Sequence, residues 1–140
     1  MTARLTRCEV TDQVLDPAAM AAEVDHPRCG AVVTFAGVVR NHDEGKDVSA
    51  LSYSAHPSAD AQLRAVAEEM LTVPGVHAIA VAHRVGDLAI GDVALAAAVA
   101  GEHRGEAFAT LERLVEEVKK RVPIWKHQRF ADGTMGWTGL

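Results

Sequence analysis

The chain has 140 residues, a formal net charge of −5 at pH 7, and 49% hydrophobic but only 4% aromatic residues. This length suits a single domain over residues 1–140 with a core of Ala, Val, Leu and Ile. The acidic balance disfavours nucleic-acid binding through the phosphate backbone, and the most apolar stretch, residues 93–100, is far shorter than the roughly 20 residues of a membrane span. Because no signal peptide is evident and the two cysteines form no CxxC pair, we expect a cytoplasmic protein with no nucleic-acid or membrane partner.

The first half of the chain predicts two helices that alternate with strands. Asp16 before Pro17 is typical of a helix start, and Gly37 within a run of Val and Phe marks a candidate bulge. The predicted elements of this half are, in chain order, a helix over 18–24, a strand over 31–39, a polar loop over 41–47, a strand over 48–53, and a helix capped by Ser58 that ends near Pro74.

The second half predicts strands followed by the longest helix. The run 93–100 is small and continuously apolar, which is typical of a strand buried on both faces, and Pro123 ends the helix before it. The predicted elements are strands over 76–84 and 93–100, a helix over 105–122, an extended segment over 124–130, and a turn at 132–133 before a short tail. The order, roughly αββαβββαββ, predicts an α+β fold of mixed α/β layers.

Two lysines near the end of the long helix are candidates for one site. Lys119 lies at the border of the helix's apolar stripe, whereas Lys120 lies almost opposite and faces water. Lys126 follows in extended chain after the helix break, so its ammonium group and that of Lys119 can converge. The alternative is an ordinary exposed ion pair with Glu116, and helical spacing alone favours this alternative, because charges on a helix face are usually solvated.

Other cationic residues have the same two interpretations. His103 and Arg104 precede the long helix, where free backbone N–H groups attract an anion such as phosphate, yet they also suit a helix cap and a surface charge. Arg40 follows the strand that contains Gly37, where the backbone can approach a ligand, but a solvated arginine beside an acidic loop is equally ordinary.

Several classes of enzyme site are not supported by the sequence. The histidines show no HExxH or zinc-finger spacing, so we predict no metal site. GxSxG, Walker A and GxGxxG motifs do not occur, which disfavours the common hydrolases, nucleoside triphosphatases and dinucleotide-binding enzymes. Cys8 and Cys29 have no activating group close in sequence, so we expect structural roles for both.

Four segments, taken in order and with their spacing, resemble the large, catalytic subunit of molybdopterin synthase, the MoaE family. They are GAVVTFAGVVRNH at 30–42, HRVGDL at 83–88, EHRGEAF at 102–108 and KKRVPIWK at 119–126. The resemblance covers the chain from about Gly30 to Trp137. It implies an α/β hammerhead-type domain with an additional small β subdomain, which is dimeric.

The resemblance also implies an activity and a partner. The expected enzyme is a sulfurtransferase of molybdenum cofactor biosynthesis, which takes sulfur from the C-terminal thiocarboxylate of a small ubiquitin-like sulfur-carrier subunit. Two sulfur atoms pass to cyclic pyranopterin monophosphate and form the dithiolene of molybdopterin. The expected assembly is a homodimer within a heterotetramer, with one carrier at each end and no cofactor or metal.

By motif, the resemblance implies these substrate-binding positions: Val38, Val39, Arg40, His103, Arg104, Lys119, Lys126, His127 and Gln128. Among them, His103 and Arg104 are expected to serve the neighbouring protomer's site. We expect Lys119 to be the main catalytic residue and Lys126 to assist at the thiocarboxylate. Glu102 stands where a small or uncharged residue is expected, and Gln128 stands where many relatives carry an acid, but neither change removes a cation. The tail after Met135 is assigned no role.

Two other functions fit part of the pattern. A transferase that carries sulfur as a persulfide on its own Cys8 or Cys29 is one, and a module that docks a ubiquitin-like carrier without performing chemistry is the other. Retained activity of a Cys8→Ser, Cys29→Ser double variant with the external carrier would exclude the first. Carrier binding with no dithiolene formed would favour the second.

Overall fold

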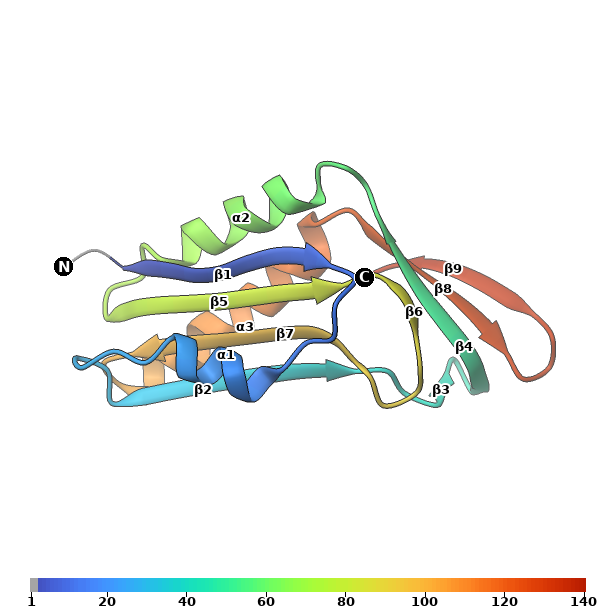
Figure 1. The fold of residues 1–140 in the computed structure, drawn as a ribbon, viewed down its shortest axis with the longest axis horizontal. Helices are drawn as coiled ribbons and strands as arrows, with labels where there is room; N and C mark the ends of the chain where they lie inside the picture. Colours follow the sequence, from blue (N-terminus) through green and yellow to red (C-terminus); the bar gives the residue numbers. More distant parts are fainter. Residues whose placement is uncertain (1–2) are drawn as a thin grey trace.

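The computed structural model describes residues 3–140 and has an α+β fold built on two β-sheets (Figure 1), which confirms the predicted fold class. The elements in chain order are β1 (Arg4–Thr11), α1 (Pro17–Glu23), β2 (Ala31–Val38), β3 (His42–Asp43), β4 (Lys46–Ala55), α2 (Ala59–Met70), β5 (Val76–Arg84), β6 (Gly86–Leu88), β7 (Val93–Gly101), α3 (Arg104–Arg121), β8 (Ile124–Phe130) and β9 (Met135–Gly139). No helix in this part of the chain is long and apolar enough to cross a membrane.

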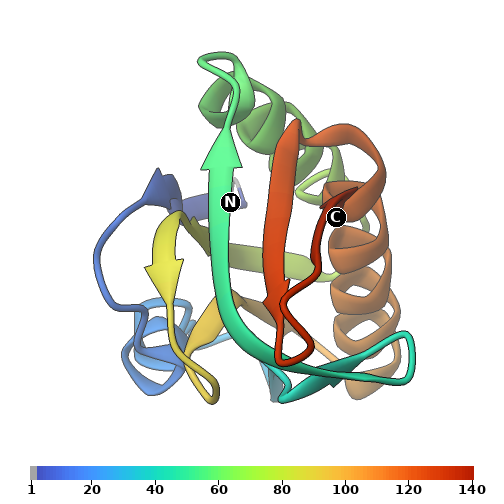
Figure 2. The same ribbon diagram turned by 90° about the vertical axis from the view of Figure 1, so that its right-hand side faces the viewer.

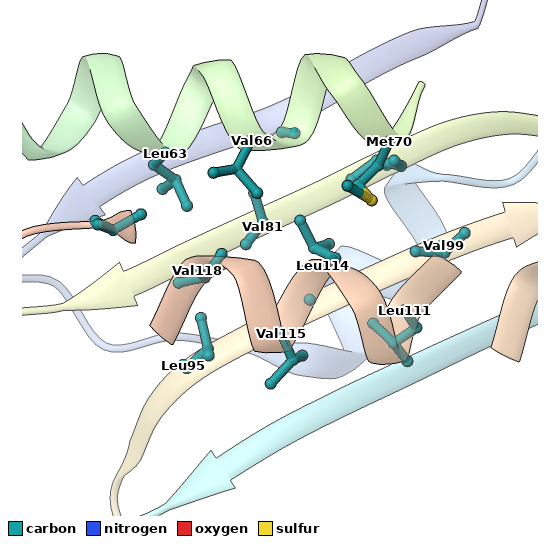
Figure 3. Packing of buried hydrophobic residues seen from close by; sticks show 14 of the residues in the cluster. Leu63, Val66, Met70, Val81, Leu95, Val99, Leu111, Leu114, Val115 and Val118 are labelled. Atoms are coloured by element: carbon teal, nitrogen blue, oxygen red, sulfur yellow. The ribbon is translucent and has the colours of Figure 1, made fainter. Parts of the chain in front are cut away.

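The larger sheet has the strand order β1-β5-β7-β2 and carries helices on both faces. β1 runs parallel to β5, and the other pairs are antiparallel. Helices α2 and α3 cover one face, where the main core forms (Figure 3). Its side chains include Leu63, Val66, Met70, Val81, Leu95, Val99, Leu111, Leu114, Val115 and Val118.

The opposite face of this sheet is lined by alanines from β5 and β7, against which the short helix α1 packs through Met20. Small side chains let a seven-residue helix lie close to the strands. The start of α1 confirms the sequence prediction, because the Asp16 carboxylate accepts hydrogen bonds from the backbone N–H groups of Ala18 and Ala19.

The smaller sheet has the order β3-β4-β8-β9, with β6 also paired to β4. It lies across the end of the larger sheet at which β2 and β5 finish and β7 begins (Figures 1 and 2). The last turn of α3 reaches the same region and continues through Pro123 directly into β8. The predicted site residues at the end of α3 and in β8 therefore lie around the junction of the two sheets.

Some predicted elements differ from the structure. β1 was not predicted, because a register shift between Leu5 and Arg7 breaks the alternation of inward-facing residues. The expected loop at 41–47 contains a tight hairpin between β3 and β4. Ser58 does precede α2, but its hydroxyl pairs with the His56 ring at 2.9 Å and makes no capping hydrogen bond. The bulge predicted at Gly37 is confirmed by a register shift between β2 and β7.

Candidate functional site

A cavity of about 380 Å³ lies where the larger sheet, the smaller sheet and the end of α3 meet. Its floor includes Gly37, Leu95 and His83, which are register partners across β2, β7 and β5. A Cβ on Gly37 would lie 3.1 Å from the Phe35 ring, so glycine keeps the floor open. The lining residues are Phe35, Gly37, Val38, Arg40, Tyr53, His83, Ala94, Leu95, Lys119, Lys126, Gly139 and Leu140.

The structure brings Lys119 and Lys126 to the wall of this one cavity. Lys119 lies in the last turn of α3, and Val122 leaves the helix with extended backbone angles, φ −85° and ψ 122°. The chain then enters β8, in which Ile124 and Gln128 are buried, so Lys126 between them faces inward too. Lys120 does not line the cavity, as the helical spacing predicts.

A second, smaller cavity of about 60 Å³ adjoins the first and shares Val38, Arg40, Tyr53 and Lys126 with it. Val39 and Gln128 also line this smaller cavity, together with Asp43 of β3. The side chains around it form a polar network. The contacts are Gln128 Nε2 to Asp43 Oδ2 at 2.8 Å, Arg40 Nη2 to Asp43 Oδ1 at 3.3 Å, and Lys126 Nζ to Asp43 Oδ2 at 3.5 Å.

His83 is a buried histidine on the cavity floor. Its Nδ1 donates a hydrogen bond to the Arg84 carbonyl oxygen at 2.8 Å, and the Tyr53 ring meets it edge-on with centroids 4.9 Å apart. Burial lowers the pKa of His83 to about 4, and the positive charge of Lys119 contributes in the same direction. The imidazole is therefore neutral at pH 7, and its Nε2 is an acceptor in a cavity that Arg40, Lys119 and Lys126 also line.

His103 and Arg104 do not line the cavity of their own chain. Arg104 is the first residue of α3 and Lys119 lies in its last turn, which separates them by about 22 Å at 1.5 Å per residue. Both residues are exposed at the helix N-terminus, and the His103 backbone N–H donates to Glu106 Oε1 at 2.7 Å. The structure therefore makes these two residues available to another molecule and not to the cavity of the same chain.

His127 lies on the opposite face of β8 from Lys126. Its ring stacks on Trp137 of β9 with centroids 4.4 Å apart, and it lines a separate hollow that also contains Asp87 and Arg129. The other predicted site residues, Val38, Val39, Arg40 and Gln128, border the two adjoining cavities.

Sequence reasoning missed several residues of the site. His83 belongs to the HRVGDL segment, but its place on the floor depends on the pairing of β5 with β7. Asp43 was read as part of a polar loop, and Gly139 and Leu140 lie at the cavity because β9 pairs with β8. Among the predicted elements, only the turn at 132–133 indicated that β9 pairs with β8. Within residues 3–140, no group of three or more His, Cys, Asp or Glu side chains is arranged to hold a metal ion.

Comparison with known proteins gives consistent matches over most of the chain. A family model described as MoaE protein matches residues 10–121. The molybdopterin synthase catalytic subunit of Emericella nidulans is 35% identical over 130 residues, covering 92% of this chain and 67% of the relative. Molybdopterin synthase catalytic subunit 1 of Mycobacterium tuberculosis is 37% identical, covering 94% of this chain and 90% of the relative.

Solved structures agree with these matches. The crystal structure of molybdopterin synthase from Staphylococcus aureus has a TM-score of 0.85 at 31% identity, covering 94% of this chain and 96% of that one. A complex of subunits 1 and 2 of molybdopterin-converting factor from Helicobacter pylori has a TM-score of 0.74 at 23% identity, which supports the fold alone. The family model and these relatives, taken with the cavity at the end of α3, show that the chain belongs to the MoaE family.

Proposed function

We propose that this protein is the catalytic subunit of a molybdopterin synthase and acts in molybdenum cofactor biosynthesis as a sulfurtransferase. It transfers two sulfur atoms from the C-terminal thiocarboxylate of a small ubiquitin-like carrier to cyclic pyranopterin monophosphate. The observation that carries the proposal is the single cavity of about 380 Å³ that Arg40, Lys119 and Lys126 all border. Membership of the MoaE family supports the same assignment.

The cationic cavity suits this reaction because both substrates are anions. A cyclic phosphate and a thiocarboxylate repel each other, and clustered cations offset that repulsion as the two are brought together. Arg40 is mostly exposed at the cavity and presents planar donors that match a phosphate, while the lysines act as compact charges nearer the reacting atoms. Cationic side chains thus supply the electrostatic stabilisation, and we propose that the reaction needs no metal or cofactor.

Proton transfer accompanies the exchange of oxygen for sulfur. Lys119 is the main catalytic residue in this proposal, because it borders the cavity beside the neutral His83 ring. Lys126 assists at the thiocarboxylate end. Val38, Val39 and Gln128 contact substrate in the adjoining cavities, and His127 contributes from the other face of β8.

The proposed assembly is a homodimer that binds one carrier at each end, which makes a heterotetramer. His103 and Arg104 then bind substrate in the neighbouring protomer's cavity. The length of α3 supports this division, because an arginine side chain cannot span about 22 Å to the cavity of its own chain.

A reconstituted assay tests the proposal. Purified chain, thiocarboxylated carrier and cyclic pyranopterin monophosphate are mixed, and molybdopterin is measured after oxidation to its fluorescent derivative. Lys119→Ala is expected to lower the rate about 100-fold or more, because it removes a proton-transfer group and a cation. Lys120→Ala is the matched control and is expected to keep the wild-type rate, since Lys120 lies outside the cavity.

Full sulfur transfer by Lys119→Ala would contradict the assigned role. Carrier binding by the wild-type chain with no dithiolene formed would indicate a docking module. A persulfide mechanism is disfavoured because burial raises the pKa of Cys8 to about 11 and also raises the pKa of Cys29, so thiolate is scarce at neutral pH. Unchanged activity of the Cys8→Ser, Cys29→Ser double variant would exclude that mechanism.

A further inference from the structure

Asp43 is a carboxylate placed among the cations of the site. One of its oxygens lies 3.3 Å from Arg40 Nη2, and the other lies 3.5 Å from Lys126 Nζ. The second oxygen also accepts a hydrogen bond of 2.8 Å from Gln128 Nε2. A single side chain therefore contacts three of the residues that the proposed function assigns to substrate.

A tight hairpin fixes the position of this carboxylate. β3 pairs with β4 so that Asp43 lies opposite Lys46, and the two residues between them, Glu44 and Gly45, have φ of 51° and 77°. Positive φ at both central residues is the geometry of a two-residue hairpin whose twist matches that of its strands. The backbone of Asp43 is thus fixed by strand pairing, which places its carboxylate within reach of Lys126 and Gln128.

Of the two ion pairs of Asp43, the one with Lys126 is the stronger. The Lys126 and Asp43 side chains are 23% and 22% exposed, so solvent screens their attraction only in part. The Arg40 side chain is 64% exposed, and its pair with Asp43 is accordingly weak. The hydrogen bond from Gln128 lowers the pKa of Asp43, and Lys126 and Arg40 lower it further, so the carboxylate is ionised at neutral pH.

The Asp43 carboxylate fixes the orientation of the Gln128 amide. The amide nitrogen donates to Asp43, and the buried amide oxygen accepts no hydrogen bond from the residues that the structure describes. Turning the amide over would place its oxygen against the Asp43 carboxylate. The contact therefore holds Gln128 in one orientation beside Lys126.

We infer that Asp43 is a positioning residue for sulfur transfer, which holds the Lys126 ammonium group toward the cavity through the direct ion pair and through Gln128. The inference rests on the proposed function and adds a residue to it. Without this anion, the ammonium of Lys126 is repelled by Arg40 and Lys119, and no other carboxylate within residues 3–140 pairs with it. Asp43 itself does not contact the reacting atoms.

A charge relocation tests the inference. Asp43→Asn removes the anion and keeps the side-chain shape, and it is expected to lower kcat roughly 10-fold, since displacing a catalytic group by about 1 Å costs up to ~100-fold. Lys126 and Gln128 are neighbours on the inner face of β8, so Gln128→Glu places a carboxylate beside the same ammonium. The Asp43→Asn, Gln128→Glu double variant is therefore expected to recover most of the lost kcat. Glu44→Gln is the matched control, because it removes an exposed acid from the same hairpin.

The position of the Lys126 side chain provides a second readout that needs no turnover. Crystal structures of the variants are expected to show the Lys126 ammonium group displaced from the cavity in Asp43→Asn and returned to it in the double variant, because the carboxylate at position 128 replaces the missing anion.

Two results would overturn the inference. One is wild-type kcat and an unmoved Lys126 side chain in Asp43→Asn. The other is a loss of activity that Gln128→Glu does not recover, with the Lys126 side chain placed as in the wild type, which is what a purely structural role predicts. If the wild-type chain performs no sulfur transfer, the proposed function fails, and the position of Lys126 in the variant structures alone still decides whether Asp43 holds it.

Discussion

At the scale of single residues, His83 shows how burial sets the protonation state of a side chain in the cavity. The ring is 2% exposed, and its pKa of about 4 lies well below the 6.5 of a free histidine. An unfolded chain therefore binds a proton at this residue between about pH 6.5 and 4, while the folded chain does not. The neutral ring makes its full contribution to the free energy of unfolding above pH 6.5. This free energy falls by ~3 kcal/mol as the pH approaches 4.

This linkage predicts a change in acid sensitivity. His83→Gln removes the titrating ring, so urea unfolding measured from pH 7 to 4.5 is expected to show a smaller loss of stability than the wild type over the same interval. The exposed His42→Gln is expected to show the wild-type dependence. An acid dependence in His83→Gln as steep as that of the wild type would mean that the ring is protonated in the folded chain.

The contrast between neighbouring residues shows what sequence can predict at this scale. Lys119 and Lys120 differ only in their angle around a helix, and helical periodicity separated the lysine that can reach a cavity from the one that faces solvent. Only the resemblance of the motifs to a known family favoured a site for Lys119. Asp43 could not be found in this way, because its role depends on contacts with a strand 80 or more positions later in the chain. Local patterns do not encode such contacts.

At the scale of elements, α3 carries the site at one end and the His103–Arg104 pair at the other. Its apolar stripe was predicted from spacing, and the structure buries most of it in the core against β5 and β7, although Phe108 of the predicted stripe is 59% exposed. β1 was missed because its bulge breaks the local alternation, while β7 was found because a continuous run of alanine and valine suits burial on both faces. Elements with an uninterrupted local pattern were predictable, and those that depend on irregular pairing were not.

The packing of α3 predicts the cost of weakening it. Leu114 of α3 is fully buried against α2 and the sheet. Leu114→Ala is therefore expected to lower the free energy of unfolding by about 2–5 kcal/mol. Arg113→Ala, at the preceding and exposed position, is expected to change the free energy of unfolding by less than about 0.5 kcal/mol. Denaturant titration measures both. Equal stabilities for the two variants would show that α3 is not held by this core.

At the scale of the whole molecule, the cavity of one chain is an incomplete site in the proposed function. Arg40, Lys119 and Lys126 border it, but His103 and Arg104, which are proposed to bind substrate, lie about 22 Å away along α3. If one chain supplies Lys119 and its partner supplies Arg104 to the same site, a mixed dimer of a Lys119 variant and an Arg104 variant regains activity. One of the two sites in a mixed dimer then has both residues intact, and the other site has neither.

Equal amounts of inactive Lys119→Ala and Arg104→Ala chains, unfolded together and refolded to mix protomers, are therefore expected to recover about a quarter of the wild-type rate, because random pairing makes half of the dimers mixed. Each variant refolded alone is the control and is expected to stay inactive. A mixture no more active than these controls, with mixed dimers demonstrated by differential tagging, would place both residues in the site of one chain. That result would require a path from Arg104 to the cavity that the rigid length of α3 does not offer.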